Sequence, residues 1–106
     1  METISVAVHG ALGKVGREVL AAVSADAALK LVGAVDIKAD SDFINVGQSK
    51  IPLYKNLKDL IDKSKPRVMV DFSIAEASID AIRTAAKSGV DMVIGTTGFP
   101  ARKLQK

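Results

Sequence analysis

The fold is decided by the stretch VAVHGALGKVG at residues 6–16. An apolar run, which predicts a buried strand, breaks at Gly10, and two further glycines follow at intervals of three, Gly13 and Gly16. In the related G-x-G-x-x-G fingerprint, the first glycine makes a tight turn, the second admits a pyrophosphate, and the third lets a helix pack on the strand. The stretch therefore predicts an anion held at the N-terminus of a helix.

Two features beyond this stretch support the prediction. Apolar residues recur at helical spacing and predict a helix over residues 13–24. Asp36 ends the next apolar run about 20 residues after Gly16, the usual offset of a carboxylate that binds the adenosine ribose. Two simpler interpretations stay open, namely that the glycines only make turns and that Asp36 only caps a loop.

Composition narrows the class of protein. A length of 106 residues suits one domain, and the absence of cysteine excludes disulfides and thiolate chemistry. No apolar run is long enough to span a bilayer and none resembles a signal peptide, so we expect a cytoplasmic protein that does not bind membranes. The net charge of +3 comes from a basic terminus with Arg102, Lys103 and Lys106. We therefore expect no nucleic-acid partner, and we assign no metal ligands.

Strand and helix patterns alternate along the chain. Strands are expected at residues 4–9, 30–36, 67–72 and 90–94, with a short strand near 52–54 in the otherwise unclear segment 37–55. Alternation with short connections predicts a single α/β domain with a Rossmann-like, doubly wound parallel sheet.

Two further helices carry start signals. Asn56 is the expected N-cap of the first, with Asp59 at the capping-box position, and Ser73 with Glu76 forms a capping box for the second. The apolar face expected for the second helix consists of Ala75, Ile79, Ile82 and Ala86.

Four segments, in order and spacing, resemble the N-terminal domain of the 4-hydroxy-tetrahydrodipicolinate reductase family, also called dihydrodipicolinate reductases. They are GALGKVG at 10–16, AVD at 34–36, VDFS at 70–73 and VIGTTGF at 93–99. The resemblance implies a domain that binds NADH or NADPH. It implies an oxidoreductase that reduces 4-hydroxy-tetrahydrodipicolinate to tetrahydrodipicolinate on the route to diaminopimelate and lysine.

The family's C-terminal domain binds the dicarboxylate substrate, carries a dihistidine motif and forms the homotetramer. Residues 1–106 contain no such motif, so the resemblance assigns no catalytic residue here. We expect this chain by itself to be a monomer or weak dimer without turnover. A stand-alone dinucleotide-binding or regulatory module without catalysis remains the alternative.

The resemblance also implies a cofactor site. The pyrophosphate would lie on Gly10, Ala11, Leu12, Gly13, Lys14 and Val15; the adenosine ribose on Asp36, with Lys38 as a nearby cation; and the nicotinamide beside Gly95, Thr96 and Thr97, with Phe72 and Ser73 lining the cleft. His9 and Asp71 are interpreted as structural, because the sequence identifies no carboxylate partner for His9.

Overall fold

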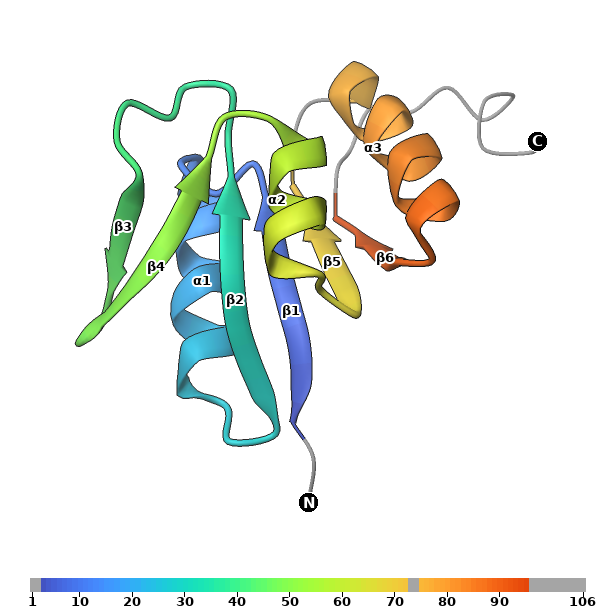
Figure 1. Cartoon of the computed structure of the whole chain (residues 1–106). Helices are drawn as coiled ribbons and strands as arrows, with labels where there is room; N and C mark the ends of the chain where they lie inside the picture. The colour runs from blue at the N-terminus through green and yellow to red at the C-terminus, as the bar shows by residue number, and fades with distance from the viewer. Residues whose placement is uncertain (1–2, 73–74, 96–106) are drawn as a thin grey trace.

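The computed structural model describes residues 3–72 and 75–95. Its elements are β1 (Ile4–His9), α1 (Lys14–Ala25), β2 (Leu29–Val35), β3 (Phe43–Val46), β4 (Ser49–Tyr54), α2 (Leu57–Ser64), β5 (Val68–Asp71), α3 (Ala75–Ser88) and β6 (Asp91–Ile94). The strands form one sheet in the order β3-β4-β2-β1-β5-β6. Figure 1 shows α1 behind this sheet and α2 in front of it, with α3 beside α2. The expected doubly wound α/β fold is confirmed.

The core has two parts because successive residues of a strand point to opposite faces of a sheet. On β1, Val6 and Val8 belong to the cluster that also holds Leu20 of α1. Ala7, between them, belongs to the cluster with Leu60 of α2. Each face of the sheet is thus sealed by its own helices, which leaves the ends of the strands to carry a site.

The segment 37–55 differs from the expectation. It forms an antiparallel hairpin, β3–β4, in which Val46 pairs with Ser49. The two-residue turn starts at Gly47, whose φ of 59° suits a residue without Cβ. β4 then pairs in parallel with β2, so the sheet is parallel except at the β3 edge. Short strands, half-buried and interrupted by Pro52, gave too weak an alternation to predict the hairpin.

The expected N-cap of α2 is present, whereas the buried face of α3 differs from the expectation at one residue. The Asn56 side chain accepts a hydrogen bond from the Lys58 backbone N–H at 2.8 Å, as expected of an N-cap. In α3, however, Ala81 and Ala85 are buried while Ala86 is exposed, so the expected face is wrong at Ala86. Alanines occur all around this helix, and their small side chains define its apolar face poorly.

Candidate nucleotide-binding site

The carboxyl ends of four adjacent strands line up at one edge of the sheet. His9 of β1 pairs with Val35 of β2 on one side and with Asp71 of β5 on the other, and Asp71 pairs with Ile94 of β6. The residue that follows each of these is a candidate site residue: Gly10, Asp36, Phe72 and Gly95. Open α/β sheets bind ligands at this edge, where the strand order reverses. In Figure 1 the arrowheads of β2 and β4 point toward it.

Two of the three fingerprint glycines are required by the fold itself. Gly10 has a φ of 79°, in the left-handed region that favours glycine. A Cβ on Gly16 would overlap the carbonyl oxygen of Gly10 and lie 3.0 Å from the Cα of Ala11. Because both of these are backbone atoms, they have little freedom to move aside. The first turn and the close helix packing predicted from the sequence are therefore present.

Gly13 is different. Its φ of −71° and ψ of 166° are extended values that any residue adopts. A Cβ on Gly13 would meet only the Gly10 carbonyl oxygen, at an ordinary contact distance of 3.5 Å. Neither the backbone conformation nor the packing of the described residues explains a glycine at this exposed N-cap position.

The backbone N–H groups at the start of the loop are already used within the protein. The N–H groups of Gly10 and Ala11 donate to the Val35 carbonyl, at 2.9 and 3.3 Å. The Gly13 N–H donates to the Gly10 carbonyl at 3.2 Å, and the Leu12 N–H donates to the Asp36 carboxylate at 2.9 Å. These four residues shape the loop and offer no spare backbone donor.

Spare donors begin with the first turn of α1. Lys14 and Val15 are exposed, and their N–H groups have no acceptor among the described residues. Unpaired N–H groups at a helix N-terminus, where the helix dipole is positive, are suited to bind an anion. Gly13, the N-cap residue, has no side chain that would compete for them.

Asp36 is held in place from three directions. One carboxylate oxygen accepts the Leu12 N–H, and the other accepts the Lys38 N–H, each at 2.9 Å. Its own N–H donates to the Tyr54 carbonyl at 3.0 Å. The residue is only 9% exposed, so its carboxylate depends on these hydrogen bonds in place of bulk water.

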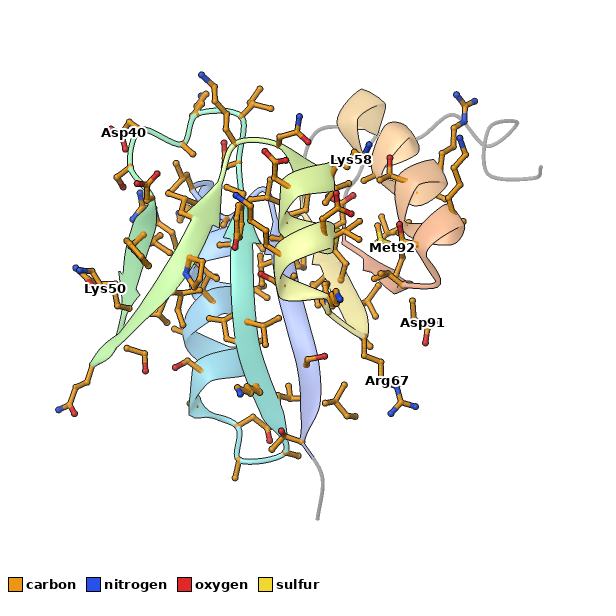
Figure 2. All side chains as sticks on the ribbon, in the orientation of Figure 1. Asp40, Lys50, Lys58, Arg67, Asp91 and Met92 are labelled. Atoms are coloured by element: carbon orange, nitrogen blue, oxygen red, sulfur yellow. The ribbon has the colours of Figure 1, made fainter. Side chains whose placement is uncertain are left out.

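Charged side chains are unevenly distributed around this edge. The Lys14 and Lys38 side chains are exposed beside the glycine loop and Asp36. In Figure 2, Arg67 and Asp91 lie at the opposite end of the sheet, where β5 and β6 begin, and Lys50 lies on the hairpin. Lys14 and Lys38 are thus two cations placed by sequence position beside the glycine loop and Asp36.

At the ends of β5 and β6, the Phe72 ring lies beside Gly95. A Cβ on Gly95 would overlap the ring of half-buried Phe72. The Gly95 N–H donates to the Asp71 carbonyl at 2.8 Å, and the Phe72 N–H donates to the His9 carbonyl at 2.9 Å. The last three predicted site residues lie outside the described residues: Ser73, Thr96 and Thr97.

A polar pair that the sequence analysis missed lies just below this edge. The Nδ1 atom of His9 is 3.3 Å from a carboxylate oxygen of Asp71, and the two side chains are 8% and 0% exposed. The pair links β1 to β5 within the sheet. Its members are far apart in the sequence, so only the strand order, which places β5 beside β1, reveals them.

The described residues contain neither a membrane-spanning helix nor a cluster of metal ligands. No helix within residues 3–72 and 75–95 has the length and apolar character needed to cross a membrane. The same residues bring no three histidine or carboxylate side chains together as a metal site.

Comparisons with known proteins agree with one another. A sequence profile described as "Dihydrodipicolinate reductase, N-terminus" matches residues 4–106. A 4-hydroxy-tetrahydrodipicolinate reductase of Dehalococcoides mccartyi is 46% identical over 108 residues, which cover 100% of this chain and 41% of that protein. The Methanocaldococcus jannaschii protein of the same name is 38% identical over 105 residues, which cover 91% and 38%. The chain therefore spans about two-fifths of the length of these relatives.

Solved structures also match this chain, one from the same family as the relatives above and another in fold alone. A dipicolinate-bound dihydrodipicolinate reductase from Paenisporosarcina sp. TG-14 matches with a TM-score of 0.80 and 30% identity, over 97% of this chain and 41% of that one. A Rex-family repressor in complex with β-NAD+ and operator DNA matches with a TM-score of 0.69 and 12% identity, over 98% and 55%. At that identity the second match concerns the fold alone.

Proposed function

Since this chain belongs to the dihydrodipicolinate reductase family, as its N-terminal domain, we propose that it is the cofactor-binding part of an NAD(P)H-dependent reductase. The reaction proposed for the whole protein is the reduction of 4-hydroxy-tetrahydrodipicolinate to tetrahydrodipicolinate, in diaminopimelate and lysine biosynthesis. A stand-alone regulatory module is not favoured, because the relatives that cover the whole chain are named as reductases.

The proposed site rests mainly on one observation: neither the backbone nor the packing at position 13 requires a glycine. The fold explains Gly10 and Gly16, whereas a Cβ on Gly13 would make one ordinary contact, with the Gly10 carbonyl oxygen, and Gly13 precedes two spare N–H donors. A pyrophosphate on the N–H groups of Lys14 and Val15 would occupy the space beside Gly13 and would exclude any larger side chain.

The remaining contacts follow from the same edge. The lone pairs that Asp36 still has free would accept hydrogen bonds from the adenosine ribose. Phe72 follows β5, two strands from β2, and Gly95 follows β6, one strand further. Both would face the nicotinamide, together with Thr96 and Thr97. When bound, the reduced cofactor supplies a hydride, and this chain's residues orient it.

Both reduced cofactors are proposed as ligands. Asp36 favours a free 2′-hydroxyl and repels a 2′-phosphate, whereas Lys14 and Lys38 offset the repulsion. We expect the affinities for NADH and NADPH to agree within about tenfold, or about 1.4 kcal/mol. Calorimetric titration of the folded chain with each cofactor tests this, and the absence of binding by both would refute the proposed function.

Asp36→Ala tests the ribose assignment. Loss of charge-assisted hydrogen bonds should weaken NADH binding by about 1–3 kcal/mol. NADPH should lose less, because removal of the carboxylate also removes its repulsion of the 2′-phosphate. Equal losses would show that Asp36 does not contact the ribose.

Partners and location complete the proposal. The dicarboxylate substrate and the homotetramer would require the part of the relatives that this chain does not span, so we propose a monomer or weak dimer for residues 1–106. We propose a cytoplasmic location, where biosynthetic reductases find reduced nicotinamide cofactors.

A further inference from the structure

We propose that Asp36 is also a positioning residue for the pyrophosphate loop, so that the ribose and pyrophosphate subsites are coupled through one carboxylate. The proposal rests on the dinucleotide site proposed above. It goes further, because it predicts that Asp36 controls the binding of a ligand that has no ribose.

The coupling begins at the Leu12 peptide. Its N–H has a single acceptor among the described residues, the Asp36 carboxylate at 2.9 Å, 24 positions away in the sequence. Its carbonyl accepts a hydrogen bond from Nε of Arg17 at 3.1 Å, from an exposed side chain. The Asp36 carboxylate is therefore the more buried of the two groups that hold this peptide.

Leu12 lies immediately before the part of the loop that would hold the anion. The spare N–H groups of Lys14 and Val15 follow two and three residues later, across the N-cap residue Gly13. A glycine adds backbone freedom at this point, so the loop needs an external anchor to keep the two N–H groups aimed at one ligand. Asp36 supplies that anchor.

The carboxylate is itself well anchored. Its second oxygen accepts a hydrogen bond from the Lys38 N–H at 2.9 Å, and the backbone N–H of Asp36 donates to the Tyr54 carbonyl. Each carboxylate oxygen has a further lone pair, so a ribose hydroxyl can add to this arrangement without displacing the Leu12 N–H. One carboxylate can thus bind the ribose and anchor the loop at the same time.

The proposal and simple electrostatics predict opposite changes in anion affinity when the Asp36 carboxylate is removed. Removing a negative charge near an anion site should strengthen binding of an anion that never touches it. If Asp36 anchors the loop, the same change weakens binding, because the Leu12 N–H loses its acceptor and the donors of Lys14 and Val15 lose their alignment.

The experiment uses inorganic pyrophosphate, which has no ribose, and follows the amide signals of Lys14 and Val15 by NMR during titration. Asp36→Ala should weaken pyrophosphate binding by about fivefold to tenfold, the equivalent of one lost hydrogen bond. Asp26→Ala is the matched control: the Asp26 carboxylate also accepts a backbone N–H, from Ala28 at 2.8 Å, but at the far end of α1. Asp26→Ala should leave the affinity for pyrophosphate unchanged.

A second variant keeps the test decisive if Asp36→Ala does not fold. Replacing the amide of Leu12 by an ester removes only its N–H and leaves Asp36 intact. It should weaken binding of pyrophosphate and of NADH by the same factor. The matched control is an ester at Ala28, whose N–H donates to the Asp26 carboxylate at the far end of α1, and it should leave pyrophosphate binding unchanged.

The two proposals fail in different ways. Unchanged or tighter pyrophosphate binding by Asp36→Ala, or unchanged binding by the Leu12 ester, would overturn the coupling while NADH binding by the natural chain still stands. If neither NADH nor pyrophosphate shifts the amides of Lys14 and Val15 in the natural chain, the proposed site fails and the coupling with it.

Discussion

Gly13, the N-cap of α1, and Gly16, in its first turn, allow stability to be separated from binding. We predict that Gly13→Ala weakens cofactor binding with little effect on stability, whereas Gly16→Ala lowers the free energy of unfolding. Both variants add the same methyl group, three residues apart. They differ in what that methyl group meets and in whether the residue caps the helix or lies within it, and each serves as the control of the other.

The size of each effect follows from the contacts. At Gly13 the methyl group lies 3.5 Å from one carbonyl oxygen, and the backbone is extended. The entropy lost by the unfolded chain stabilises the variant by about 0.4–1 kcal/mol, and alanine is a poorer N-cap than glycine by a similar amount. These terms nearly cancel, so the free energy of unfolding should change by less than about 0.5 kcal/mol.

At Gly16 the methyl group would overlap the Gly10 carbonyl oxygen and crowd the Cα of Ala11. Overpacking against such atoms costs about 1–3 kcal/mol or more, and the better helix propensity of alanine returns at most about 1 kcal/mol. We expect a net loss of about 2 kcal/mol.

Urea unfolding followed by circular dichroism measures the stabilities, and calorimetry measures NADH binding. Gly13→Ala should lose at least about tenfold in affinity, since its methyl group takes the place of the pyrophosphate, and Gly13→Val should not bind at all. A Gly13→Ala variant as unstable as Gly16→Ala, or one that bound NADH like the natural chain, would refute the assignment of Gly13 to the pyrophosphate.

Three further predictions concern the rest of the edge. Gly95→Ala should lower the free energy of unfolding by about 1–3 kcal/mol through its overlap with the Phe72 ring, and adding Phe72→Ala should recover part of that loss in urea unfolding; strict additivity would contradict the contact. His9→Ala removes a partner of fully buried Asp71 and should cost about 2–4 kcal/mol by the same assay, so a change below about 0.5 kcal/mol would show that the pair contributes little. On the proposed function, residues 1–106 alone should not oxidise NADH when substrate is generated in a coupled assay, because orientation of the substrate, worth about 7–11 kcal/mol, would depend on the part of the relatives that this chain does not span; substrate-dependent loss of NADH would contradict this.

Much of the fold could be predicted from local patterns. The apolar run of β1, the glycine spacing and the Asn56 cap are signals within a few residues of one another, and each one matches an element of the structure. The β3–β4 hairpin was missed because its strands are short and half-buried, so their alternation is weak. In α3, abundant alanines made the buried face ambiguous.

Contacts between distant segments could not be predicted in this way. The His9–Asp71 pair depends on β1 and β5 being neighbours, and the hydrogen bond from Leu12 to Asp36 depends on how the loop turns over the end of β2. The family resemblance, too, assigns residues 10–15 to the pyrophosphate only as a group. Only the hydrogen bonds distinguish the residues that shape the loop from Lys14 and Val15, whose donors are spare.

The central claim is that the spare donors at the start of α1 hold the pyrophosphate of a nicotinamide dinucleotide. A crystal structure of the chain with NADH tests it most directly. We predict pyrophosphate oxygens within hydrogen-bonding distance of the N–H groups of Lys14 and Val15, over the open face of Gly13, with the adenosine ribose on Asp36. A dinucleotide bound elsewhere, or one whose pyrophosphate lies away from Gly13, would contradict the account.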